Sequence, residues 1–288
     1  MKADPQILYS HVKLLAGIEP PRNYRNRESL DRAAEYIATE LSKTGTRVYE
    51  QPFTANGSIY RNVIGSLGPE NGPLIVVGAH YDVAGDQPGA DDNASAVAGL
   101  LETARLIAHR EEELSIRLEL VAYCLEEPPF FCSPQMGSAV HAAHLAEKNT
   151  EVELMVCYEM IGYFTEELNS QSYPAFLPIA VHTDRGDFIA VVGLESQGYL
   201  AEHLASQIQE HSLIEAVAVN FPSAHGVQSL SDHKNYWAYG YPAVMLTDTS
   251  FLRNPHYHQE TDTPDTLDYK LMAEVVNGMA AAVLNYSK

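Results

Sequence analysis

Four apolar segments of this chain have the character of buried strands, and each leads into side chains that could bind a metal ion. The segments with their polar residues are 74–79 with His80, 117–125 with Glu126 and Glu127, 153–158 with Glu159, and 243–249 with His256 and His258. In an open α/β sheet, ligands bind at the carboxyl ends of the strands, where neighbouring strand ends converge. The pattern therefore predicts that these side chains meet in one polar site at an edge of a sheet.

The succession of strands and helices favours an α/β fold. A run without polar alternation, as at 74–79, is typical of a strand that helices cover on both faces. Strands at 47–53 and 59–67, separated by a segment that contains Asn56 and Gly57, predict a hairpin at one edge of the sheet. Further elements are predicted as helices near 30–41, 97–107, 137–148, 200–208 and 272–283, and as a strand at 187–192. We therefore expect a three-layer α/β/α architecture with a mixed, mostly parallel central sheet.

Composition excludes several classes of partner. The 288 residues show no compositional break, repeat or linker, so residues 1–288 are predicted to form a single catalytic domain. A formal net charge of −20 argues against nucleic acid and against anionic membrane surfaces, because Lys and Arg supply the affinity for both. No apolar run reaches the roughly 18 residues that a membrane-spanning helix needs.

The N-terminus and the cysteines bear on the compartment. No apolar stretch of a secretory signal follows Met1 and Lys2. The three cysteines, Cys124, Cys132 and Cys157, fit no metal or redox spacing. An odd number of cysteines without a signal predicts a reducing, cytoplasmic location. The oligomeric state stays open between a monomer and a small homo-oligomer.

Two acidic pairs carry the most chemical information, although each has a bland explanation. Asp91 and Asp92 precede a helix whose apolar face begins at Val97, so helix capping would account for them, but a carboxylate there could also bridge two cations. Glu126 and Glu127 end a buried strand, where unpaired charge is costly, although a solvated strand end remains the alternative. In a metal site, one glutamate of such a pair could bind the metal while its neighbour acts as general base.

The remaining candidates are histidines and one further glutamate. His80 and Asp82 form a His-x-Asp pair, and a metal-bound imidazole usually donates its second N–H to a carboxylate. Glu159 ends another apolar strand. Either His256 or His258 could be a metal ligand. Taken singly, each of these residues could equally be an ordinary surface residue. A set of two histidines and three carboxylates suits zinc better than manganese or cobalt.

The motifs resemble, in order, the signature of the co-catalytic zinc aminopeptidases, which include bacterial leucine-type aminopeptidases and are related to glutaminyl cyclases. The matching segments are His80-Tyr81-Asp82, Gly89 to Ser95, Glu126-Glu127, Glu159-Met160 and His258 to Thr263. The resemblance runs from about residue 26 to the C-terminus. It implies a zinc-exopeptidase-like fold, two zinc ions per chain, and hydrolysis of the N-terminal bond of peptide substrates by a metal-activated water.

The resemblance also implies a role for each position. Asp92 would bridge both metals, Glu127 and His258 would complete one site, His80 and Glu159 would complete the other, Glu126 would be the general base, and Asp82 would support His80. Glutamate at position 159 replaces the aspartate of many members, and its extra methylene would move the second metal. The segment 128–131, Pro-Pro-Phe-Phe, replaces a turn of small residues, and we expect it to reshape the substrate pocket.

Other functions remain to be weighed against the peptidase. A glutaminyl cyclase would use a single zinc and the same glutamate as proton shuttle, and a catalytically inactive peptidase-like domain would only bind. The run Ser231-Asp232-His233 suggests a serine hydrolase, but adjacent residues do not define a triad, and Gly-x-Ser-x-Gly is absent. We expect this run to form a turn, or to line the site behind the ligands. The irregular stretch 162–186 is predicted to be a functional loop.

Overall fold

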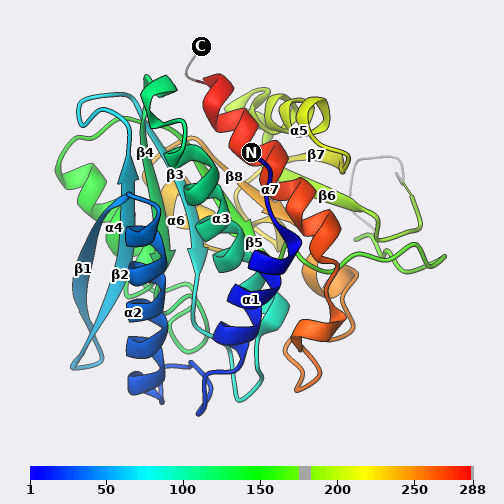
Figure 1. Cartoon of the computed structure of the whole chain (residues 1–288), viewed down its shortest axis with the longest axis horizontal. Coiled ribbons are helices and arrows are strands. Elements are labelled where there is room, and N and C mark those ends of the chain that lie inside the picture. Colours follow the sequence, from blue (N-terminus) through cyan, green and yellow to red (C-terminus); the bar gives the residue numbers. More distant parts are fainter. Residues whose placement is uncertain (175–182, 287–288) are drawn as a thin grey trace.

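The computed structural model describes residues 1–174 and 183–286 and shows an α/β molecule built on one sheet (Figure 1). The helices are α1 (Pro5–Ala16), α2 (Arg27–Lys43), α3 (Ala96–Ala108), α4 (Gly137–Glu147), α5 (Leu200–His211), α6 (His233–Trp237) and α7 (Tyr269–Tyr286). The strands are β1 (Arg47–Ala55), β2 (Ser58–Leu67), β3 (Leu74–His80), β4 (Arg117–Tyr123), β5 (Val152–Glu159), β6 (Phe188–Leu194), β7 (Glu215–Phe221) and β8 (Ala243–Thr247).

The sheet is mixed, as the sequence predicts. Its strand order is β1-β2-β4-β3-β5-β8-β6-β7. The central strands β4, β3, β5 and β8 run parallel, and the hairpin of β1 and β2 joins antiparallel to β4. Strand β6 pairs antiparallel with β8 and parallel with β7, a junction that the sequence does not predict. The parallel centre brings the carboxyl ends of β4, β3 and β5 to the same edge.

Helices cover both faces of the sheet and explain its continuous apolar strands. Figure 1 shows α1, α2, α3 and α7 in front of the sheet with α4 and α6 behind it. In β3, Ile75 and Val77 belong to the apolar cluster under the front helices, whereas Leu74 and Val76 belong to the cluster under α4 and α6. Both sets of side chains are buried, so the strand carries no alternating polar face. The three-layer α/β/α prediction is confirmed.

Several elements differ from the sequence prediction. Strand β4 ends at Tyr123 rather than at Leu125, because Leu125 adopts a left-handed φ of 66° that turns the chain out of the sheet. Helices α1 and α6 and strand β7 were not predicted. The stretch predicted as a functional loop is irregular where it is described, and 175–182 lie outside the described residues.

Two further predictions concern the whole chain. Among the described helices, none is long and apolar enough to cross a bilayer. The assignment of residues 1–288 to a single domain stays a prediction, although all eight strands join one sheet.

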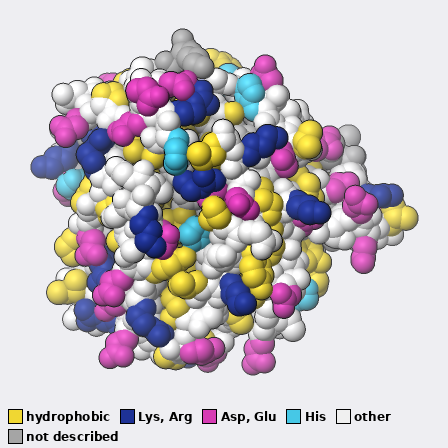
Figure 2. Space-filling view, in the orientation of Figure 1, with side chains coloured by type: hydrophobic (Ala, Val, Ile, Leu, Met, Phe, Trp, Pro, Cys, Tyr) yellow, Lys and Arg dark blue, Asp and Glu magenta, His cyan; other side chains and the backbone are white. Residues whose placement is uncertain are grey.

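On the face shown in Figure 2, acidic side chains lie interspersed with basic ones.

Candidate metal centre

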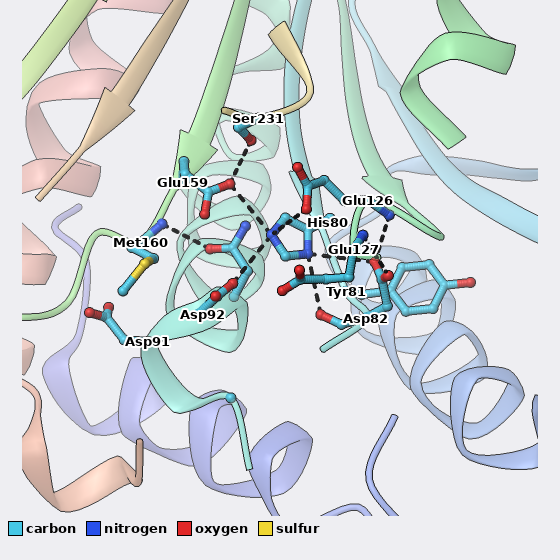
Figure 3. A network of polar contacts seen from close by, with 12 residues as sticks. His80, Tyr81, Asp82, Asp91, Asp92, Glu126, Glu127, Glu159, Met160 and Ser231 are labelled. Atoms are coloured by element: carbon cyan, nitrogen blue, oxygen red, sulfur yellow. Dashed lines mark hydrogen bonds and ion pairs between the residues drawn. The ribbon is translucent and has the colours of Figure 1, made fainter. Parts of the chain in front are cut away.

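Side chains from three neighbouring strand ends point toward a common centre. His80 is the last residue of β3, Glu159 is the last residue of β5, and Glu126 and Glu127 follow β4. Figure 3 shows these four residues with Asp92 around one space, while Asp91 points away from it. The convergence follows from the parallel pairing of β4, β3 and β5, which aligns their carboxyl ends.

Asp92 lies between two imidazoles and is shared by two groups of possible ligands. Its Oδ1 is 3.4 Å from His80 Nε2, and its Oδ2 is 3.0 Å from His258 Nε2. Glu159 Oε2 lies 3.4 Å from His80 Nε2, and Glu127 Oε1 lies 3.5 Å from His258 Nε2. The ligand atoms of His80, Asp92 and Glu159, and those of Asp92, Glu127 and His258, lie within 4.8 Å of one another in each group.

Three polar atoms of the centre are buried without the hydrogen bonds that would normally compensate them. Asp92 Oδ1, Glu126 Oε1 and His258 Nε2 have no hydrogen-bond partner within the described part of the chain. Burial raises the pKa of Glu127 to about 7, with a further rise from Asp92, and burial likewise raises the pKa of Glu126. Clustered buried carboxylates are costly unless they are paired or coordinate metals. Imidazole nitrogens and carboxylate oxygens are zinc ligands, so this donor set fits the metal that the sequence predicts.

The turn before Asp92 depends on a glycine. Gly89 has a left-handed φ of 64°, and a Cβ built there would collide with Val83 and with the carbonyl oxygen of Asp92. After Asp92, Asn93 ties the turn to the end of β5: its Oδ1 accepts the N–H of Met160 at 2.9 Å, and its Nδ2 donates to the carbonyl of Tyr158 at 3.2 Å. The turn is therefore fixed on both sides of Asp92.

Asp82 contacts both His80 and the glutamate pair. The sequence assigns it to His80, whose Nδ1 lies 3.5 Å from Asp82 Oδ1 and 3.2 Å from the Asp82 carbonyl. Its two carboxylate oxygens accept the backbone N–H groups of Glu126 and Glu127, each at 3.1 Å. Asp82 therefore fixes the main chain of the glutamate pair, a contact that sequence reasoning did not find.

The carboxylate of Asp262 holds the main chain of Asp91 and Asp92, as that of Asp82 holds the main chain of Glu126 and Glu127. Its carboxylate oxygens accept the backbone N–H groups of Asp91 at 2.8 Å and of Asp92 at 3.1 Å. Sequence reasoning used Asp262 only to choose His258 over His256, and it missed this contact. In the structure, His258 Nε2 lies 3.0 Å from Asp92 Oδ2, whereas His256 contacts Thr261.

The Ser231-Asp232-His233 run does not form a catalytic triad. The Ser231 hydroxyl donates to Glu159 Oε2 at 2.5 Å (Figure 3), and the His233 ring is bound to the Gln228 carbonyl at 2.6 Å. Both carboxylate oxygens of Asp232 are buried without a described partner, and burial raises the pKa of Asp232 to about 7. The run therefore lies behind the ligands, as one of its two sequence interpretations predicts.

A mostly apolar cavity of about 110 Å³ adjoins Glu159. Its walls include Phe188, Val192, Val219, Phe221, Met245 and Tyr257. Tyr257 stacks on the ring of His258 with centroids 3.8 Å apart, which places the cavity beside the possible ligands. None of the described residues 128–131 lines this cavity, and Phe130 packs against Tyr24 and Tyr60 instead. The sequence analysis expects residues 128–131 to reshape the substrate pocket, but these residues do not line this cavity.

Comparison with known proteins gives a family match over most of the chain. The sequence pattern of Peptidase family M28 matches residues 62–283. A protein of Escherichia coli (strain K12) described as uncharacterized protein YfbL is 43% identical over 98% of this chain and 88% of its own length. Leucine aminopeptidase 1 of Ajellomyces capsulatus is 25% identical over 83% of this chain, which spans 59% of that protein.

Solved structures share the fold across nearly the whole chain. The zinc aminopeptidase BSAP of Bacillus subtilis matches with a TM-score of 0.78 and 15% identity, covering 99% of this chain and 96% of that chain. A glutaminyl cyclase of Bacteroides thetaiotaomicron, bound to N-acetylhistamine, matches with a TM-score of 0.73 and 17% identity, covering 99% of each chain. At these identities the likeness shows the α/β fold alone.

Proposed function

This chain belongs to Peptidase family M28, and on that premise we propose that it is a zinc-dependent aminopeptidase that removes the N-terminal residue of peptides. The observation that carries the proposal is the position of Asp92, whose two oxygens face His80 and His258. Each of these pairs is completed by a carboxylate, so that two groups of three ligands share one residue. A shared carboxylate is what a two-metal hydrolase requires.

Five residues would hold the ions. Glu127 and His258 would bind one zinc, His80 and Glu159 would bind the other, and Asp92 would bridge them. Bound zinc supplies positive charge that polarises a scissile carbonyl and makes a nearby water more acidic. The hydroxyl of Ser231 donates to Glu159 Oε2, the same oxygen that lies 3.4 Å from His80 Nε2, and this hydrogen bond orients the carboxylate at the centre.

Glu126 is the residue we propose as general base. Its Oε2 lies 3.9 Å from His80 Nε2, and its Oε1 is buried without a described hydrogen-bond partner, so the carboxylate is at the centre but is not committed to a structural contact. Burial raises its pKa, which favours acceptance of a proton. Glu126 would take the proton of the attacking water and pass it to the leaving amine.

The cavity beside Glu159 supports a preference for apolar N-terminal residues. Its walls are mostly aliphatic and aromatic, and the carboxylates of the centre lie at the end where Glu159 and Tyr257 contribute. A peptide with its apolar first side chain in the cavity would place its cationic amino group near Glu159. Opposite charge at that point would favour a free amino terminus over a blocked one.

A panel of aminoacyl anilides, assayed with zinc and then with chelator, tests the proposal. Leucyl and phenylalanyl anilides should be cleaved faster than lysyl and glutamyl anilides, N-acetylated substrates should resist, and chelation should abolish turnover. The result that would overturn the proposal is full activity after the metal has been removed and its absence verified by elemental analysis.

A glutaminyl cyclase is the second candidate, because a solved cyclase shares the fold over 99% of each chain. A cyclase would release pyroglutamate from a glutaminyl peptide and would need one zinc, whereas an aminopeptidase would release free glutamine. The presence of both ligand groups around Asp92 favours the peptidase. An inactive binding domain is disfavoured for the same reason, since all the ligand positions are filled by suitable residues.

A further inference from the structure

Arg22 is an arginine with an unusual environment. Its side chain is buried, with 1% of the residue exposed, and all its described partners are main-chain carbonyl oxygens. Nε donates to Tyr81 at 2.9 Å, Nη1 donates to Leu15 at 3.0 Å and to Pro88 at 2.6 Å, and Nη2 donates to Gly89 at 2.5 Å.

The carbonyls that Arg22 binds lie on the two turns that carry possible ligands. Tyr81 stands between His80 and Asp82, and Gly89 begins the turn to Asp92. One planar guanidinium therefore joins the end of β3 to the turn before α3. His80 Nε2 and Asp92 Oδ1 lie 3.4 Å apart across this junction. A change in the spacing of the two turns would therefore alter the distance between these two proposed ligands.

The positive charge of Arg22 is compensated from a distance by the centre itself. Burial lowers the pKa of Arg22 to about 10, and the charges of Asp262, Asp92 and Asp82 oppose that effect. Burial of a charge is costly unless other groups compensate it. The acidic residues of the centre and the buried cation therefore stabilise each other.

We propose that Arg22 is a positioning residue of the metal centre. Its guanidinium holds the turns of His80 and Asp92 at the spacing that zinc needs, and its charge offsets the clustered carboxylates before a metal binds. The inference rests on the proposed zinc-dependent function and extends it to a residue outside the matched family region, which begins at residue 62. Lysine cannot replace it fully, because an ammonium lacks the rigid planar fork that reaches several carbonyls at once.

Zinc binding to Arg22→Lys and Arg22→Met tests this role, with Arg25→Met as the matched control. Arg25 is on the same segment, but it is exposed and pairs at the surface with Asp86. Competition with a chromophoric chelator gives the zinc affinity, elemental analysis gives the stoichiometry, and thermal unfolding of the metal-free proteins reports the fold. Substitutions behind metal ligands typically lower affinity about 10- to 100-fold.

We expect both Arg22 variants to lose zinc affinity within that range, with a larger loss for methionine, while Arg25→Met binds as the wild type does. Activity at saturating zinc should fall mainly in kcat. If the methionine variant does not fold, the lysine variant, which keeps the charge, carries the test. Wild-type zinc affinity in a folded Arg22→Lys protein, whether or not its unfolding temperature has dropped, would overturn the inference. A wild-type protein that binds no zinc would instead overturn the proposed function.

Discussion

Asp82 and Asp262 perform the same task on the two acidic pairs of the centre. Each carboxylate accepts two consecutive backbone N–H groups, those of Glu126 and Glu127 for Asp82 and those of Asp91 and Asp92 for Asp262. Hydrogen bonds from N–H groups to an ionised acceptor are stronger than those between neutral groups. The main chain of each acidic pair is thus fixed by an aspartate that lies shortly after a histidine: Asp82 after His80, and Asp262 after His258.

Replacing Asp262 with asparagine should loosen the turn of Asp92, because an amide offers one acceptor and directs a donor toward the second N–H group. We expect zinc affinity to fall about 10- to 100-fold, as for other residues behind metal ligands. Asp265→Asn is the control, since Asp265 is exposed. Chelator competition measures the effect, and equal affinities for the two variants would contradict it.

Replacing Glu126 with glutamine should separate binding from catalysis. The variant keeps the size of the side chain but cannot accept the proton, so kcat should fall about 100- to 10,000-fold while both zinc ions stay bound. Elemental analysis and steady-state kinetics give the two quantities. Glu112→Gln, at an exposed position, should match the wild type. Full turnover by the Glu126 variant would remove this residue from the mechanism.

At the scale of elements, the sequence predicts what depends on local pattern. The apolar run at 74–79 identifies β3, and the acidic pair after β4 marks the edge at which the centre forms. Helix α1 was missed although its signals are present: Asp4 caps it by accepting the N–H of Gln6, and its buried residues recur with helical spacing. Strand β7 was missed because it is an edge strand with only partial burial.

Contacts between distant segments are what the sequence cannot supply. Asp262 reaches Asp91 across 171 positions and Ser231 reaches Glu159 across 72, and neither contact leaves a local pattern. The antiparallel pairing of β6 with β8 is likewise a choice of topology that two similar apolar runs do not determine. The proposed ligand set could be predicted from motif order, whereas the residues that position it required the fold.

The turn between β3 and α3 should be sensitive to substitution of Gly89. Alanine there meets both a left-handed φ of 64° and a collision with Val83, whereas Gly57→Ala meets a similar φ of 77° in open space. The left-handed conformation costs both variants about 1–2 kcal/mol. Overpacking should cost Gly89→Ala a further 1–3 kcal/mol or so. Denaturant unfolding measures the difference, and equal stabilities would contradict the packing argument.

At the scale of the whole molecule, the buried apolar side chains form two clusters, and His233 is buried beside Trp237 of the second cluster. His233 lies against Trp237, with ring centroids 4.5 Å apart, and its Nδ1 has no described partner. Burial lowers the pKa of His233 to about 4. Between about pH 4 and pH 6.5, His233 is therefore neutral in the folded protein but protonated in the unfolded chain.

The contribution of His233 to the free energy of unfolding should consequently fall as the pH drops from about 6.5 to about 4. In that range the unfolded state binds a proton at position 233 and the folded state does not, so unfolding is favoured. The contribution reaches about 3 kcal/mol at the lower limit. His233→Asn should be less stable at neutral pH, and the difference in unfolding free energy between it and the wild type should shrink as the pH falls. Parallel curves of unfolding free energy against pH for the two proteins would refute this.

Zinc removal should lower the stability of the entire protein. A metal that binds only the folded state adds about 2.7 kcal/mol when its free concentration is 100 times its Kd. Thermal unfolding with zinc and with chelator measures this difference, and Asp92→Asn serves as the control because it lacks the shared ligand. An unfolding temperature that is independent of zinc would contradict a metal-binding centre.

The contact of Asp262 with residues 91 and 92 has a consequence for how the protein is made. The segment that carries both His258 and Asp262 is synthesised well after its partners at residues 91 and 92. A nascent polypeptide that stops before residue 258 lacks one proposed ligand and the carboxylate that holds residues 91 and 92, so the proposed zinc centre can form only after this segment has been synthesised.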